Sequence, residues 1–222
     1  MSSQRFPGKV LHNVIGRPLL GYTFDRIRKA NHLDGIILAT SELDEDAPIA
    51  HFAKEEGVSC FRGPLENVAL RMFNAGCYEN ADAILRISGD SPMIDPLVVS
   101  SVAARFKASS QVDVVTNVQE RTFPKGQSVE VFSMKAMERL LNMELTENDL
   151  EHVTSGFYRH PDEFNISNIK HTENMSDLQL SVDTPEDMRV FELLVERFRS
   201  NFIDLSFQEL AVALFKVNLL NK

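Results

Sequence analysis

Short apolar runs and longer amphipathic stretches alternate along most of the chain. The apolar runs, bounded by polar or turn-forming residues, predict strands over 35–40, 58–61, 81–87, 112–117, 128–132 and 178–182. Helical spacing of apolar residues predicts helices over 18–30, 47–57, 65–80 and 96–108. Such alternation is typical of βαβ units, in which helices cover both faces of a mostly parallel sheet. We therefore expect an α/β fold.

Capping residues mark two further helices near the end of the chain. Thr184 suits an N-cap, with Pro185 at the first helical position. Ser206 and Glu209 have the spacing of a capping box before a last helix. Between about 117 and 151 the alternation is irregular, which we interpret as an insertion within a single domain spanning 1–222. This insertion is expected to serve an acceptor substrate or a subunit contact.

Two aspartates stand where predicted strands end. Asp90 follows the run over 81–87, in "LRISGDSPMIDP", and Asp183 follows the run over 178–182. In open α/β sheets, ligands bind outside the carboxyl ends of the strands. Magnesium takes one or two carboxylates and fills its other positions with water and phosphates. Either the pair converges on a divalent cation, or each aspartate is a turn former or helix cap.

The N-terminal stretch "SSQRFPGKVL" has the composition of an anion-binding loop. Its backbone N–H groups and the cations Arg5 and Lys9 could surround phosphates. The spacing of a P-loop is absent, so an ordinary polar N-terminus is the alternative.

The charge distribution favours one local anionic ligand over a polyanion. The formal net charge is −9, which argues against broad nucleic-acid binding. Residues 1–30 nevertheless hold six basic residues and one acidic residue. A solvated helix face with Arg26, Arg28 and Lys29 would explain part of this excess.

Composition places the chain among globular proteins. Its 222 residues are 43% hydrophobic and 25% charged, and no apolar stretch approaches a membrane span. The start shows no secretory pattern, and Cys60 and Cys77 have neither metal nor disulfide spacing. We expect a cytoplasmic protein that binds neither membrane nor nucleic acid.

Three further side chains are candidates for chemistry. Arg86 lies in a strand predicted to be buried, so it needs an internal acid or an anionic ligand. His152, beside Glu151, could act in acid–base catalysis or could be a satisfied polar residue. Arg71, on a predicted helix, could simply face solvent. Motifs of serine hydrolases, zinc proteases and dithiol oxidoreductases are absent from the sequence.

Taken together, several stretches resemble the cytidylyltransferase family of sugar activation, especially its SpsF-type spore coat polysaccharide biosynthesis members. These are relatives of the acylneuraminate and 3-deoxy-manno-octulosonate cytidylyltransferases. The matching stretches occur in the family's order and are "MSSQRFPGKVL", "ILATSELDEDAPI", "FRGPLENVALR", "LRISGDSPMIDP", "RTFPKGQSVEVF", "EHVT" and "LSVDTPEDM".

The resemblance implies a Rossmann-like, GT-A-like nucleotidyltransferase fold of three layers. It also implies a Mg²⁺-dependent transfer of CMP from CTP to an acidic sugar, with release of pyrophosphate. We further expect a homodimer formed through the irregular insertion. The residues carried over by position are Lys9 and Asp90 for catalysis; Ser3, Arg5, Lys9, Arg71 and Asp90 for the nucleotide; Arg121, Glu130 and His152 for the acceptor; and Asp90 and Asp183 for the metal.

The chain departs from the family pattern at two places. Ser128 stands where the family usually has Asp, which bears on acceptor recognition. Relatives also carry an apolar strand ending in Ala-Arg before the residue that matches Met1, so we expect a sheet without its first strand and a truncated or misassigned start.

Two rival functions are considered. One is a glycosyltransferase with a nucleotide-sugar donor, for which the Asp44-Glu45-Asp46 stretch is the nearest metal motif. The other is a non-catalytic nucleotide-binding protein. Pyrophosphate release from CTP distinguishes both rivals from a cytidylyltransferase.

Overall fold

The strands form three separate sheets in a computed structural model, which describes residues 6–220, with side chains over 6–216. The largest sheet has the order β5–β7–β6–β8. Its strands β5, β6 and β8 run in one direction, and β7 runs antiparallel between β5 and β6. A second sheet pairs β3 with β4 in parallel, and β1 and β2 form a short hairpin. The strands are β1 (Asn13–Val14), β2 (Arg17–Pro18), β3 (Ile37–Ser41), β4 (Ser59–Gly63), β5 (Ala83–Arg86), β6 (Val114–Thr116), β7 (Glu130–Ser133) and β8 (Ile166–Asn168).

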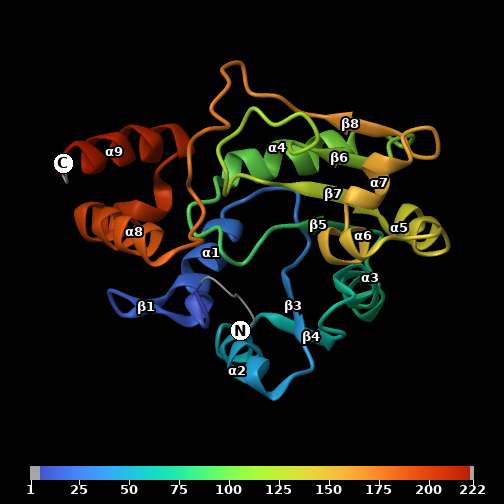
Figure 1. Cartoon of the computed structure of the whole chain (residues 1–222), viewed down its shortest axis with the longest axis horizontal. Helices are drawn as coiled ribbons and strands as arrows, with labels where there is room; N and C mark the ends of the chain where they lie inside the picture. The colour runs from blue at the N-terminus through green and yellow to red at the C-terminus, as the bar shows by residue number, and fades with distance from the viewer. Residues whose placement is uncertain (1–5, 221–222) are drawn as a thin grey trace.

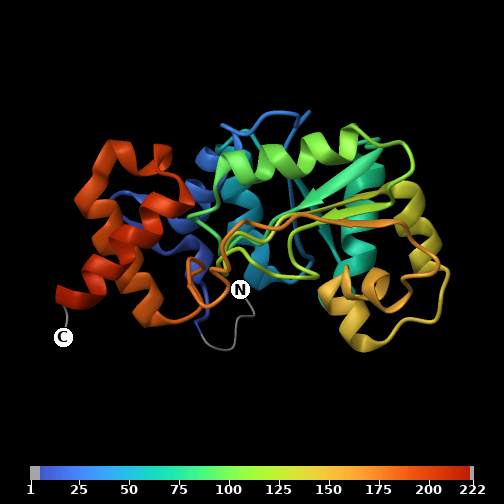
Figure 2. The same cartoon turned by 90° about the horizontal axis from the view of Figure 1, so that it is seen from above.

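Helices cover these sheets on both sides (Figure 1). They are α1 (Leu19–Ile27), α2 (Ala47–Glu55), α3 (Val68–Tyr78), α4 (Pro96–Lys107), α5 (Met134–Leu141), α6 (Glu147–His152), α7 (Ser155–Arg159), α8 (Pro185–Phe198) and α9 (Phe207–Leu220), with 3-10 turns η1 (Lys9–Leu11), η2 (Asp44–Asp46) and η3 (Arg199–Asp204). Seen from above, α4 lies on one face of the large sheet and α5, α6 and α7 lie on the other (Figure 2).

Successive side chains along the strands of the large sheet belong to two different hydrophobic clusters, one on each face of the sheet. Val115 and Val131 point to the face under α4, and α8 and α9 extend that core. Their neighbours Val114 and Phe132 point to the opposite face, where they pack with α5 and α7. The period of two along each strand therefore places apolar side chains on both faces of a central sheet.

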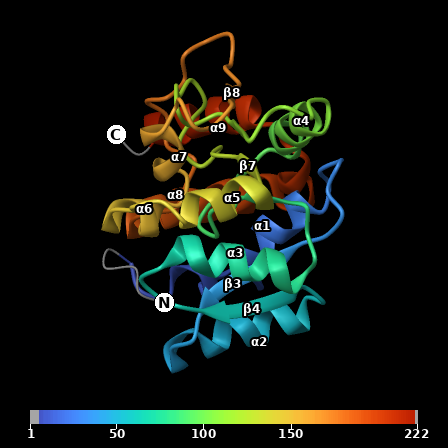
Figure 3. The ribbon, with the colours of Figure 1, turned by 90° about the vertical axis from the view of Figure 1, so that its right-hand side faces the viewer.

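Helix α3 links the two sheets. It contacts β3 and β4 on one side and α5 and α6 on the other (Figure 3). Among the described residues, β3 pairs with β4 alone and β5 pairs with β7 alone, so no strand joins the sheets. Within the described part of the chain, packing of α3 therefore connects the two sheets.

The structure differs from the sequence prediction in several elements. Residues 178–182 form no strand; Gln179 makes one isolated bridge with Lys125. The short strand β8 and the helices α5, α6 and α7 were not predicted. Residues 117–151 are more regular than expected, because they contain β7 and α5 and part of α6. The predicted caps are present: Thr184 forms a capping box with Asp187, and Ser206 exchanges hydrogen bonds with Glu209.

Arg26 corrects the interpretation of a solvated basic face on the first helix. It is fully buried and donates to the backbone oxygens of Ile94, Phe202 and Leu205, at 2.5, 2.9 and 2.5 Å. Burial lowers the pKa of Arg26 to about 10. Part of the N-terminal positive charge is therefore structural, because it holds α1 against the segments before α4 and α9.

None of the described helices has the length and apolar character that crossing a membrane requires.

Candidate active site

A buried lysine contacts both aspartates that the sequence singled out. Lys9 Nζ donates to Asp90 Oδ2 and to the backbone oxygen of Val182, each at 2.7 Å, and lies 3.6 Å from Asp183 Oδ1. The Lys9 side chain is 8% exposed, and those of Asp90 and Asp183 are 28% and 24% exposed. The expected convergence of the two carboxylates is therefore present, with a cation between them and an open side toward solvent.

Backbone contacts place the two aspartates next to each other. The N–H of Val182 donates to the carbonyl of Asp90 at 2.9 Å, which ties the loop after β5 to the segment before α8. Gly8 precedes η1 with a φ of 74°, a left-handed conformation that favours glycine and turns the chain into Lys9. Gln179 Nε2 and Ser181 Oγ lie 2.7 and 3.1 Å from Asp183 Oδ2 and orient that carboxylate.

The loop before β7 supports the Asp183 segment from behind. Gly126 has a φ of 90°, and a Cβ there would stand 2.4 Å from the carbonyl carbon of Leu180. Lys125 exchanges backbone hydrogen bonds with Leu178 and Leu180 on the same segment. The fully buried Gln127 accepts from the N–H of Asp95, so this loop also holds the segment that follows Asp90.

A second polar cluster surrounds Glu130 at the same end of the large sheet. Glu130 is 2% exposed and pairs with Arg86 at 2.6 Å, in strand register. Its other oxygen accepts from Thr154 Oγ1 at 2.6 Å and from Tyr158 Oη at 2.5 Å. Burial, reinforced by Glu130, raises the pKa of Tyr158, so the phenol stays protonated and donates. The internal acid expected for Arg86 is therefore Glu130.

Thr154 and Tyr158 were not predicted as site residues, although the sequence predicts a site in their segment. The prediction chose His152 in "EHVTSGFYRHP", but His152 is exposed at the end of α6. Thr154 and Tyr158 are four residues apart, the spacing of one helix face, and this was the signal available for finding them.

The remaining predicted residues have these places. Arg121 donates to Ser128 Oγ at 3.0 Å, and its Nη1 is buried without a hydrogen-bond partner among the described residues. Arg71 does not simply face solvent. It donates to the backbone oxygens of Pro64 and Leu65, and burial lowers its pKa. Ser3 and Arg5 lie outside the described residues.

In the acidic stretch Asp44–Asp46, the nearest candidate for a glycosyltransferase metal motif, Asp46 makes structural hydrogen bonds. Asp46 is buried and accepts from Ser41 Oγ at 2.6 Å and from Thr40 Oγ1 at 3.2 Å. These contacts tie η2 to the end of β3. In the part of the chain that the structure describes, no three His, Cys, Asp or Glu side chains are grouped to hold a metal.

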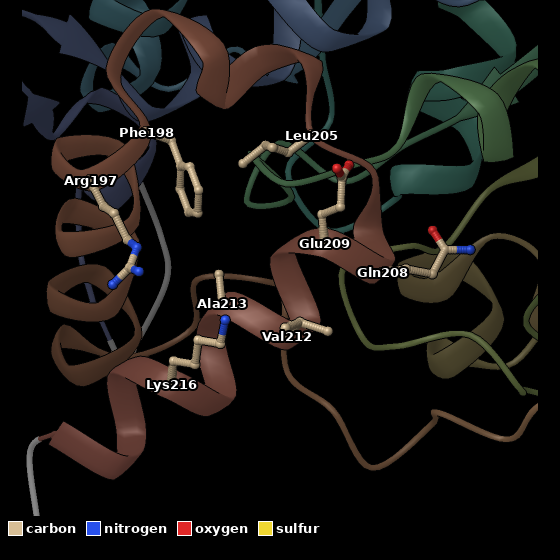
Figure 4. Close-up of a pocket in the computed structure, with 8 residues that line it drawn as sticks. All are labelled: Arg197, Phe198, Leu205, Gln208, Glu209, Val212, Ala213 and Lys216. Atoms are coloured by element: carbon tan, nitrogen blue, oxygen red, sulfur yellow. The ribbon is translucent and has the colours of Figure 1, made fainter.

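A surface groove lies between α8 and α9 (Figure 4). It is lined by Arg197, Phe198, Leu205, Gln208, Glu209, Val212, Ala213 and Lys216. None of the predicted site residues lines this groove.

Comparison with known proteins shows similarity to cytidylyltransferases and to a polysaccharide biosynthesis protein. Residues 1–217 match the family model described as Cytidylyltransferase. The spore coat polysaccharide biosynthesis protein SpsF of Bacillus subtilis is 27% identical over 89% of this chain and 83% of its own length. A 3-deoxy-manno-octulosonate cytidylyltransferase of Nitratidesulfovibrio vulgaris is 32% identical, over 57% of this chain and 50% of its own length.

Solved structures share the fold. A cytidylyltransferase from Leptospira borgpetersenii superposes with a TM-score of 0.88 at 26% identity, covering 100% of this chain and 91% of its own. A CMP:2-keto-3-deoxy-manno-octonic acid synthetase complexed with CTP superposes with a TM-score of 0.66 at 16% identity, covering 88% and 94% of the two chains. The chain belongs to the cytidylyltransferase family of CTP-dependent nucleotidyltransferases.

Proposed function

We propose that this protein transfers the CMP group of CTP to a hydroxyl of an acidic sugar and releases pyrophosphate. The observation that carries the proposal is the contact of Lys9 with Asp90 and Asp183 in a chain of the cytidylyltransferase family. The sugar acid is suggested by the name of the octulosonate cytidylyltransferase relative. The SpsF relative suggests a place in the synthesis of a surface polysaccharide or glycan.

The residues present fit a magnesium site. Asp90 and Asp183 offer hard carboxylate oxygens, and Lys9 already places one positive charge between them. Magnesium usually takes one or two carboxylates, with water and substrate phosphates completing the octahedron. Asp90 and Asp183 would hold it, and the bound ion would neutralise charge that develops on the triphosphate.

The other residues contribute binding and positioning. Attack by the oxygen of the acceptor hydroxyl forms a bond to the α-phosphorus, and the bond from that phosphorus to the oxygen bridging to the β-phosphate breaks in line with it. The hydroxyl proton is lost to solvent. Lys9 is close enough to the two aspartates to bind the same triphosphate and to stabilise the leaving pyrophosphate. Arg71 holds the loop before α3, which would contact the nucleotide. Ser3 and Arg5 would complete that contact.

We assign the acceptor to the polar cluster around Glu130. Arg86, paired with Glu130, lies at a half-buried position where an acidic sugar could bind. Arg121 donates to the hydroxyl of Ser128 and not to a carboxylate in this contact. It would therefore add a second positive charge for the acceptor. His152 would contact the acceptor from the rim, since it is exposed. The protein is proposed to act in the cytoplasm as a homodimer.

A pyrophosphate-release assay tests this proposal. The purified chain is incubated with Mg²⁺ and each of four nucleoside triphosphates, crossed with a panel of acidic and neutral sugars. We expect release with CTP and an acidic sugar together, and none when the sugar is omitted. CTP binding without release under every acceptor would favour the non-catalytic alternative.

A further inference from the structure

The Lys9 ammonium lies among oxygen atoms of three residues. It has hydrogen-bond partners in Asp90 and Val182 at 2.7 Å, and Asp183 lies within ion-pair distance at 3.6 Å. The side chain is 8% exposed, so this charge has left bulk water and depends on the two carboxylates for compensation. One positive charge of the chain therefore already balances part of the negative charge of these two acids.

A second cation cannot simply be added to this arrangement. A divalent ion on the same carboxylates would lie a few ångströms from the ammonium, where repulsion between like charges is large in a half-buried site. Lys9 also occupies Asp90 Oδ2, an oxygen that a metal bound between the aspartates would use. Metal and ammonium therefore compete for one position.

We propose that Lys9 acts as a displaceable internal cation: it holds Asp90 and Asp183 together without ligand, and metal binding drives it off them toward the triphosphate. The inference rests on the proposed function, since it takes this pair as the metal site. A lysine ammonium on a flexible four-carbon stem can move in this way without moving the backbone.

The displacement couples the two ligands. Metal alone must release Lys9 into solvent without a new partner, so it binds weakly. When the triphosphate is present, the released ammonium has phosphate oxygens to contact, and both ligands bind more tightly. Removal of Lys9 should strengthen metal binding, because the two carboxylates lose a competing cation, and should weaken nucleotide binding, because the triphosphate loses a positive partner.

The first test measures metal affinity by calorimetry with Mn²⁺ and Mg²⁺, without nucleotide or acceptor. We expect Lys9→Met to bind metal about tenfold more tightly than the parent chain. Lys29→Met is the matched control, because Lys29 pairs with Asp204 on the exposed surface and should leave the affinity unchanged. Equal affinities for the parent chain and Lys9→Met, or no binding to either, would overturn the proposal.

The second test uses the parent chain, so it does not depend on the variant's folding. Lysines are acylated with a water-soluble reagent and quantified by mass spectrometry. Lys9 should react slowly without ligand, faster with Mg²⁺, and slowly again with Mg²⁺ and a non-hydrolysable CTP analogue. Lys29 is the internal control, expected to react equally in all three states. Metal binding that leaves Lys9 reactivity unchanged would refute the displacement.

Failure of the proposed Lys9 displacement and failure of the proposed CMP transfer can be told apart. Neither the affinity measurement nor the comparison with Mg²⁺ alone requires turnover, so a chain that transfers no CMP could still show displacement. Conversely, CMP transfer with an unresponsive Lys9 would support the proposed function and reject this inference.

Discussion

At the scale of single residues, the positions of the charged groups depend on neighbours that carry no charge. Gly126 combines a φ of 90° with a backbone so close that a methyl group would overlap Leu180. The segment from Leu180 leads directly to Asp183. One glycine therefore controls how closely the loop before β7 can approach the proposed metal site.

Gly126→Ala should lower the free energy of unfolding by about 3 kcal/mol, through the unfavourable φ and the clash with Leu180. Urea unfolding followed by circular dichroism measures this loss. Gly35→Ala is the control, because a Cβ at Gly35 meets no atom within 4 Å. Equal midpoints for the two variants would show that the close approach at Gly126 is not structurally important.

Glu130 gives a second residue-scale prediction. Tyr158→Phe removes a donor from a buried carboxylate and should lower the free energy of unfolding by about 2 kcal/mol. Tyr78→Phe is the matched control, since Tyr78 is 62% exposed. Differential scanning calorimetry should show a lower melting temperature for the Tyr158 variant alone; an unchanged value would contradict the hydrogen bond.

Some of these residues can be predicted from the sequence and others cannot. Asp90 could be selected because it follows an apolar strand, at an end of the sheet where ligands bind. Asp183 follows an apolar run that forms no strand, and it reaches the same place because the N–H of Val182 donates to the carbonyl of Asp90. The burial of Arg26 could not be predicted, because its three acceptors are backbone oxygens from segments distant in the chain. Helical spacing gives no information about such partners.

At the scale of elements, the short helix α6 holds the segment that carries Thr154 and Tyr158. Its Asp149 is fully buried; it caps the helix through Thr146 and pairs with Arg159 on α7. Although burial raises the pKa of Asp149, hydrogen bonds from Thr146, Arg159 and Ser155 outweigh it and hold the pKa at about 2. The ionised carboxylate therefore joins α6 to α7.

The stabilisation from Asp149 should depend on pH in one direction. Its pKa is about 2 in the folded chain and ordinarily 3.8, so the contribution is complete above about pH 4 and is lost as pH falls toward 2. It should amount to about 2 kcal/mol at neutral pH. Asp149→Asn should therefore be less stable than the parent chain at pH 7, and the difference should narrow at pH 3.

Chemical denaturation at both pH values measures this difference, with Asp162→Asn, at an exposed acid, as the control. A difference that stays constant between pH 7 and pH 3 would contradict the role of the ionised Asp149.

Elements with strong local signals could be predicted, and those fixed by distant contacts could not. Helix α8 has a capping box, a proline at its start and an amphipathic face, all within its own sequence. The stretch 178–182 has the apolar pattern of a strand, but its backbone meets Lys125 in a single bridge. Whether an apolar stretch becomes a strand depends on a partner that local pattern does not specify.

At the scale of the whole molecule, the charged side chains of the proposed sites lie at one end of the strands of the large sheet. Arg86 ends β5 and Thr116 ends β6, and the antiparallel β7 begins with Glu130 at that same end. The loops of Asp90 and Asp183 continue from this edge, and Lys9 reaches it from the N-terminal turn η1. The proposed nucleotide and acceptor sites thus lie along one edge of the large sheet, although the chain carries a net charge of −9.

The fate of the α-phosphate of CTP tests this account most directly. CTP radiolabelled at the α-phosphate is incubated with Mg²⁺, an acidic sugar that supports pyrophosphate release, and either the parent chain or Asp90→Asn. We predict that the label appears in a sugar conjugate with the parent chain, and that Asp90→Asn forms it at least about 100-fold more slowly while remaining folded. Label found in free CMP alone, or an equal rate of conjugate formation by Asp90→Asn, would contradict the assignment of this site.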